Sequence, residues 1–166
     1  SGISASPTGP EKDGYDNLTA ALHGVFDLND SLSVTLSGRH VNATADEDTQ
    51  NFDFLSPTQG FVIDSDGQRK SKRWYGRAAA DLSLMGGQWT HRVSTGLTQS
   101  SNDSFSGGTF TFGSEGRKWD IEYQTDYSFT SGESATHAVS ALLEYEDLTY
   151  ENFGAGGGPA PRFKGR

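Results

Sequence analysis

Apolar and polar side chains alternate along six stretches of the chain. In residues 118–130, KWDIEYQTDYSFT, the apolar series begins with Trp119 and Ile121, and the charged series begins with Lys118 and Asp120. Because successive side chains of a β-strand point to opposite faces, each stretch predicts a strand with one apolar and one polar face. The six predicted strands cover residues 15–28, 31–44, 72–85, 88–101, 117–130 and 135–150.

The connections between the predicted strands differ in length in a regular way. The first, third and fifth are tight turns with the sequences LNDS, MGGQ and TSGES. The remaining polar segments predict long loops over residues 45–71, 102–116 and 151–166. The sequence therefore predicts an all-β fold, an antiparallel up-and-down meander of three hairpins with short turns at one end and long loops at the other. This asymmetry is typical of outer-membrane β-barrels.

Strand length and aromatic placement indicate which face meets water. Each alternating run has about ten or more residues, which matches the ~9–11 needed to cross a bilayer on a tilted strand. Strands of soluble sandwiches more often have ~5–6 residues. Apolar-parity aromatic residues lie toward the strand ends: Trp74 and Trp119 near long loops, and Phe26, Trp89, Tyr127 and Phe129 near short turns. These observations predict an apolar face in lipid and a polar face in a wet interior. A soluble β-sandwich binding or adhesin module and a small complete outer-membrane barrel stay open as alternatives.

Composition narrows the classes of function. Hydrophobic residues make up 33% of the 166 residues, and no apolar run reaches the length of a membrane-spanning helix. A net charge of -9 argues against a nucleic-acid partner, because phosphate binding requires a basic surface. The absence of cysteine excludes disulfides and thiolate metal sites. The chain has no G-x-S-x-G, phosphate-loop or H-E-x-x-H motif, and its four histidines are dispersed, so we do not expect an enzyme.

The number of strands predicts a piece of a larger sheet. The chain begins at Ser1 without methionine, and its last residues, PRFKGR, lack the terminal amphipathic strand that barrels normally end with. Six strands with both ends on the long-loop side are too few for a complete barrel that starts and finishes at the opposite end. We therefore expect three hairpins of a larger barrel.

Two segments resemble a known family. Residues 13–40, DGYDNLTAALHGVFDLNDSLSVTLSGRH, and residues 70–103, KSKRWYGRAAADLSLMGGQWTHRVSTGLTQSSND, are similar to consecutive hairpins of TonB-dependent outer-membrane receptors. Their order and lengths resemble the vitamin B12 (cobalamin) receptor branch. The resemblance implies a section of a 22-stranded, plugged barrel in the bacterial outer membrane. It also implies uptake of a scarce nutrient chelate, either cobalamin-like or an iron–siderophore, with TonB acting through a plug that this sequence does not contain.

The same resemblance implies calcium in the long loops. Glu11 and Asp13 lie in EKDGYDN, and Asp53 and Asp64 lie eleven residues apart in NFDFLSPTQGFVID. In the cobalamin receptors, acids at similar positions bind Ca²⁺ that orders the binding loops, although Glu11 replaces a family aspartate. Asp66 is a candidate substitute for a further family acid that is missing at Ser4. A hard cation takes six to eight oxygens. The alternative is an acidic loop that is simply solvated.

Overall fold

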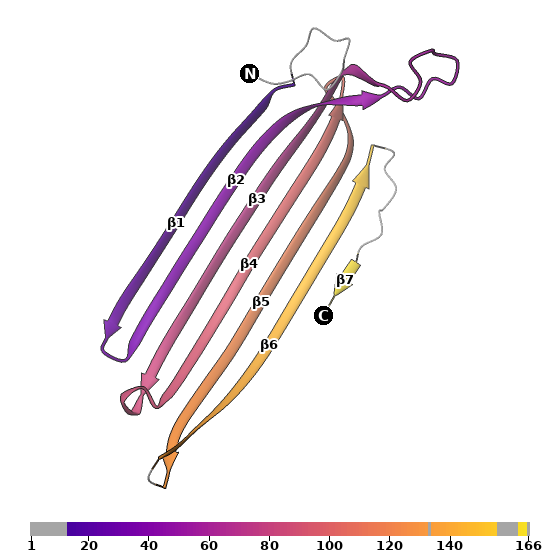
Figure 1. Cartoon of the computed structure of the whole chain (residues 1–166). Helices are drawn as coiled ribbons and strands as arrows, with labels where there is room; N and C mark the ends of the chain where they lie inside the picture. Colours follow the sequence, from indigo (N-terminus) through magenta and orange to yellow (C-terminus); the bar gives the residue numbers. More distant parts are fainter. Residues whose placement is uncertain (1–12, 133, 156–162, 166) are drawn as a thin grey trace.

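The chain forms a single antiparallel sheet in a computed structural model that describes residues 13–132, 134–155 and 163–165 (Figure 1). The strands follow one another in the sheet in the order β1 to β7. Six long strands make the up-and-down meander that the alternation predicts, and the short β7 pairs with β6. The strands are β1 (Tyr15–Asn29), β2 (Leu32–Gln50), β3 (Val62–Leu84), β4 (Trp89–Ser106), β5 (Thr109–Ser131), β6 (Ala135–Gly154) and β7 (Phe163–Gly165).

The three tight turns that the sequence predicts all lie at one end of the sheet, toward the bottom of Figure 1. The β1–β2 turn is closed by Ser31, whose backbone N–H donates to Asn29 Oδ1 at 2.9 Å. The β3–β4 turn contains the one-turn 3-10 helix η1 (Met85–Gly87), where Gly86 and Gly87 have φ angles of 67° and 92°. Glycine reaches such left-handed conformations without steric cost. The predicted three hairpins are therefore confirmed.

The predicted long loops are mostly strand, so that part of the prediction is wrong. β2 continues to Gln50 and β3 begins at Val62, which leaves only residues 51–61 of the predicted loop 45–71. In the predicted loop 102–116, only Gly107 and Gly108 separate β4 from β5, and both have positive φ. Positive φ at both central residues is what a two-residue type I′ hairpin requires. β6 also extends into the predicted loop 151–166, as far as Gly154, and β7 lies within it.

The sheet has two chemically different faces, because residues paired across an antiparallel ladder share a face. We call apolar the face that carries the paired residues Val93, Tyr123 and Leu143, and polar the face that carries Arg77 and its neighbours in register. No second layer covers the apolar face within the described part of the chain. Leu143 is 69% exposed, and Ala79 is the one buried hydrophobic residue among those described.

The apolar face changes character along the strands. Between the short turns and the level of Trp74 and Trp119 this face is hydrophobic, and we call this part of it the apolar band. Beyond that level, toward the β2–β3 loop, the same face carries Lys72, Ser101 and Glu115 in register. We call this second part of the sheet the projecting end. Its side chains are mostly polar on both faces, apart from ring contacts such as Phe105–Phe110 and Phe110–Phe153, so it lacks the regular hydrophobic alternation that predicted the other strands.

Candidate functional site

Aromatic rings mark the boundary between the apolar band and the projecting end. Trp74 on β3 stacks on His40 of β2, with ring centroids 3.9 Å apart. Trp119 on β5 contacts Tyr145 of β6 edge to face at 5.7 Å. The indole Nε1 of Trp119 also donates to Thr95 Oγ1 at 3.1 Å. Trp119 therefore combines a ring contact with a hydrogen bond, and Trp74 lies against an imidazole ring.

A second row of rings lies next to the short turns. Trp89, Tyr127, Phe129 and His137 form a continuous series with centroid distances of 6.3, 5.7 and 5.0 Å between successive rings. Trp89 Nε1 donates to Thr125 Oγ1 at 2.9 Å. The apolar band is thus bounded on both sides by amphipathic aromatic side chains.

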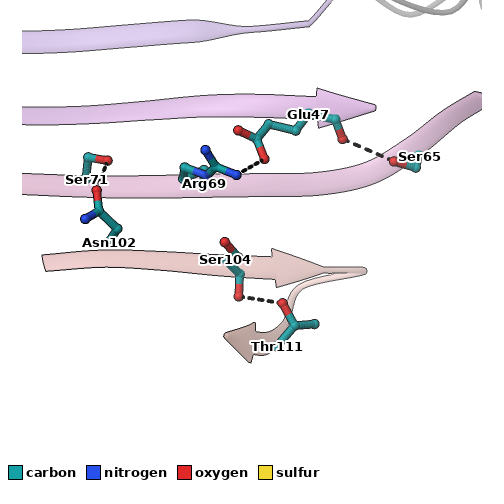
Figure 2. Close-up of polar contacts among 7 residues, drawn as sticks. All are labelled: Glu47, Ser65, Arg69, Ser71, Asn102, Ser104 and Thr111. Atoms are coloured by element: carbon teal, nitrogen blue, oxygen red, sulfur yellow. Dashed lines mark hydrogen bonds and ion pairs between the residues drawn. The ribbon is translucent and has the colours of Figure 1, made fainter. Parts of the chain in front are cut away.

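Polar side chains tie the strands of the projecting end together (Figure 2). Arg69 Nη2 lies 3.1 Å from Glu47 Oε2, and Ser65 Oγ donates to the backbone oxygen of Glu47 at 3.1 Å. Farther across the sheet, Ser71 Oγ donates to Asn102 Oδ1 at 2.7 Å. These contacts join β2 to β3 and β3 to β4. Together with the ring contacts Phe105–Phe110 and Phe110–Phe153, they hold the strands of the projecting end to one another.

The β2–β3 loop is ordered by the side chain of Asn51. Its Nδ2 donates to Ser56 Oγ at 3.1 Å and to Thr58 Oγ1 at 2.9 Å. Its Oδ1 accepts a hydrogen bond from the backbone N–H of Asp53 at 2.9 Å. The loop presents apolar side chains to solvent, since Phe54 is 83% exposed and Leu55 is 95% exposed. The sequence predicted a loop in this region, but it did not indicate that the side chain of Asn51 holds the loop together.

The acids predicted to bind calcium fall in different parts of the structure. Asp53 lies in the β2–β3 loop, where its Oδ1 accepts a hydrogen bond from the N–H of Leu55 at 2.9 Å. Asp64 and Asp66 lie on β3, and Asp13 lies two residues before the start of β1. Glu11 lies outside the described residues. Across the part of the chain that is described, no three histidine, cysteine, aspartate or glutamate side chains gather closely enough to hold a metal ion.

A different acid connects the start of β1 to this end of the sheet. Asp46 Oδ2 accepts a hydrogen bond from the N–H of Gly14 at 3.1 Å, and its Oδ1 accepts one from Gln68 Nε2 at 3.1 Å. Asp46 therefore links β1, β2 and β3 through hydrogen bonds alone. Its place in the long polar segment 45–71 was visible in the sequence, but its partners depend on the register of the two ladders.

Charges on the polar face are largely separated by sign. Three ion pairs include exceptions to this separation: Arg69 with Glu47 at 3.1 Å, Arg92 with Asp81 at 3.5 Å and Lys118 with Glu146 at 2.7 Å. The basic members on β2 to β4 are Arg39, Arg69, Arg73, Arg77 and Arg92. The acidic members on β5 and β6 are Asp120, Glu122, Asp126, Glu144 and Glu146. The polar face therefore presents a basic half and an acidic half.

The fold defines an all-β protein built as one antiparallel meander. No protein-family model matches the chain, and no curated protein matches it either. Among the residues that the structure describes, no helix is both long and apolar enough to cross a membrane.

Proposed function

We propose that the chain is a section of an outer-membrane β-barrel, with its apolar face in lipid and its polar face lining the interior. The observation that carries this proposal is the apolar band bounded by two rows of aromatic rings on one uncovered face of the sheet. Tryptophan and tyrosine concentrate at the two membrane–water interfaces, where the ring is apolar and its polar group stays hydrated.

The height of the band supports the membrane assignment. On β5 the band runs from Trp119 to Phe129, which is about ten residues. At ~3.3 Å per residue this is ~33 Å along the strand. A strand tilt of ~40° reduces it to ~25 Å along the membrane normal, the height of the apolar band of outer-membrane barrels.

The edges of the sheet support a larger barrel. Within the described residues β1 pairs only with β2, so its other edge carries unpaired N–H and C=O groups. Unpaired backbone groups cost several kcal/mol each in a bilayer, which is why membrane sheets close into barrels. Further strands beside β1 and β6 would satisfy these groups. The 22-stranded TonB-dependent receptors provide such strands.

The function that we propose is that of a TonB-dependent receptor for a scarce nutrient chelate, cobalamin-like or an iron–siderophore. The projecting end and the β2–β3 loop form the ligand end. They lie beyond the row of rings that contains Trp74 and Trp119, and polar contacts hold them in place. Coupling to TonB passes through a plug that is separate from these residues. This assignment rests on the resemblance of the hairpins together with the two-faced sheet.

The test uses the complete protein in the outer membrane of intact cells. Replacing residues 52–60 with a two-residue Asn-Gly turn removes the exposed loop and leaves the paired strands unchanged. We expect cell-surface binding of labelled cobalamin or ferric siderophore to fall, while heat-modifiable gel migration shows an assembled barrel. In a matched control variant, Met85–Gly87 at the other end of the sheet is replaced instead, and we expect ligand binding to be unchanged. A protein that is soluble without detergent and does not insert into lipid vesicles would overturn the proposal in favour of a soluble binding module.

A further inference from the structure

The β2–β3 loop holds four large apolar side chains out in solvent. Phe52, Phe54, Leu55 and Phe61 are 70%, 83%, 95% and 60% exposed, and we call them the loop tip. Figure 1 shows this loop extending away from the rest of the sheet at the upper right. None of the aromatic ring contacts among the described residues involves a phenylalanine of the loop tip. Apolar side chains gathered on a protruding surface typically mark an interaction site.

Hydrogen bonds fix the loop in this outward-facing shape. Its neck is closed by the N–H of Asn51, which donates to the oxygen of Phe61 at 2.9 Å, and by the N–H of Gly60, which donates to the oxygen of Asn51 at 2.8 Å. Inside the loop, the N–H of Ser56 donates to the oxygen of Asp53 at 3.1 Å. Binding to a loop that is already ordered costs less conformational entropy than binding to a flexible one. The loop tip is therefore preorganised for a contact.

The chain around the loop tip is acidic. Between Arg39 and Arg69 the sequence contains no lysine or arginine. The same span contains six acidic residues: Asp46, Glu47, Asp48, Asp53, Asp64 and Asp66. Asp53 is exposed within the loop, and Asp64 and Asp66 are exposed where β3 leaves it. The loop tip is thus an apolar surface with an acidic surround.

The charge of this surround selects the kind of partner. Anionic lipid headgroups and nucleic-acid phosphates would be repelled by the carboxylates. A second copy of the chain would present the same acids in a symmetric contact. A small ligand requires a concave pocket, whereas the loop tip protrudes. A protein surface with an apolar pocket and a rim of lysine and arginine fits both features, because aromatic side chains anchor interfaces and complementary charges orient association.

We propose that the β2–β3 loop docks a second protein. This partner receives Phe54 and Leu55, the most exposed side chains of the loop tip, in an apolar pocket. Its basic rim faces Asp53, Asp64 and Asp66. A single loop buries less surface than a standard protein–protein interface, so we expect a transient complex. The inference goes beyond the proposed function, because it concerns a second protein at this loop and requires no transport.

The first test uses two synthetic peptides as probes of the surface. Both have a Leu-Trp-Leu centre, which is flanked by lysines in one peptide and by glutamates in its twin. Fluorescence polarisation measures their binding to the complete protein in nanodiscs of zwitterionic lipid, with empty nanodiscs as the blank. We expect the lysine peptide to bind at least about tenfold more tightly than its twin, and Phe54→Ser to weaken its binding at least about tenfold. Gln59→Ser, a polar change in the same loop, is the matched control and keeps binding. Equal binding of the two peptides, or equal binding to the parent and Phe54→Ser, overturns the inference.

The second test looks for the partner in intact cells. The photo-reactive residue benzoylphenylalanine replaces Leu55 in one variant and Met85, at the other end of the sheet, in the control. We expect irradiation to join one protein to the Leu55 position only. That protein, once purified, should bind Phe54→Ser at least about tenfold more weakly than the parent, and the double variant Asp64→Asn with Asp66→Asn several-fold more weakly.

Three results of the second test contradict the inference. They are the absence of a cross-linked protein at the Leu55 position, cross-links to lipid or to another copy of the chain alone, and equal affinity of the purified protein for the parent and Phe54→Ser. Insertion of the complete protein into lipid vesicles is measured separately, so the proposed membrane function stands or falls on its own result.

Discussion

Gly67 lies directly opposite Glu47 in the β2–β3 ladder, and a methyl group at Gly67 would overlap with the backbone oxygen of Glu47. Gly76, nine residues further along β3, has no atom within 4 Å of the same position. Overlap with backbone is costly because neither atom can turn away. The two glycines of β3 thus form a matched pair for testing how tightly the projecting end is built.

We expect Gly67→Ala to destabilise the pairing of β2 with β3 at the projecting end by about 1–3 kcal/mol, the usual cost of overpacking. Gly76→Ala should have little effect on the same pairing. Hydrogen exchange of the amides of residues 45–50 measures the difference. Equal exchange in both variants would contradict the close packing at Gly67.

Charge on the apolar face should be poorly tolerated. Val139 is 60% exposed on that face, and Leu82 lies on it in register with Leu32. Val139→Arg or Leu82→Arg should cost about 2–4 kcal/mol for folding into lipid vesicles if the position is near the membrane midplane. Ser140→Arg and Ser83→Arg, on the polar face, are the controls and should be mild. The reverse ranking in urea titrations of vesicle-bound protein would refute the orientation.

The three tryptophans should lie at shallow depth in the bilayer. Trp74 and Trp119 bound the apolar band on one side and Trp89 bounds it on the other. We expect their fluorescence to be quenched more by lipids brominated near the headgroup than by lipids brominated at the chain end. Single-tryptophan variants measure each depth separately. Stronger quenching at the chain end for all three would contradict the two aromatic rows.

Loss of the Asn51 side chain should loosen the β2–β3 loop. Asn51→Ala removes two donated hydrogen bonds and one accepted one. At about 0.5–1.5 kcal/mol per bond, the loop should open more often and be cleaved several-fold faster by protease. Gln50→Ala, which removes a single hydrogen bond to the oxygen of Gly60, is the control and should act more weakly. Pairing of the six long strands should be the same in both.

Calcium remains a prediction from the resemblance. If Ca²⁺ orders the long-loop end, millimolar Ca²⁺ should slow proteolysis of residues 51–61 in the complete protein, and Asp53→Ala with Asp64→Ala should remove the effect. The structure supplies a competing expectation, because Asp53 already accepts a hydrogen bond within its own loop. An unchanged cleavage rate with and without Ca²⁺, equal to that of the double variant, would end the calcium proposal.

The sequence predicted the hairpins because a half-apolar strand leaves a clear signal. Trp119, Tyr123 and Tyr127 alternate with Asp120 and Glu122, and the register of β5 follows that alternation. At the projecting end the signal disappears. Lys70 pairs with Asp103 there, and most side chains on both faces are polar, so the backbone pairs without a regular hydrophobic period.

The candidate sites were harder to predict, because they depend on register. Asp46 was visible in the long polar segment, but its partners Gly14 and Gln68 join it only through the register of the β1–β2 and β2–β3 ladders. Sequence spacing cannot supply such a pairing until the hairpin turns are placed. The acids of the predicted calcium set share a region of sequence, but that nearness did not bring three of them together among the described residues.

The one-sided pairing of β1 bears on how the chain behaves when it is purified. Its fifteen residues, YDNLTAALHGVFDLN, contain no proline, lysine or arginine, the residues that natural edge strands use to discourage association. Leu18 and Leu22 are 65% and 68% exposed beside that edge. A chain of these residues expressed alone is therefore expected to stack edge to edge into oligomers and inclusion bodies, and a proline or lysine placed on β1 is the direct means of keeping it dispersed.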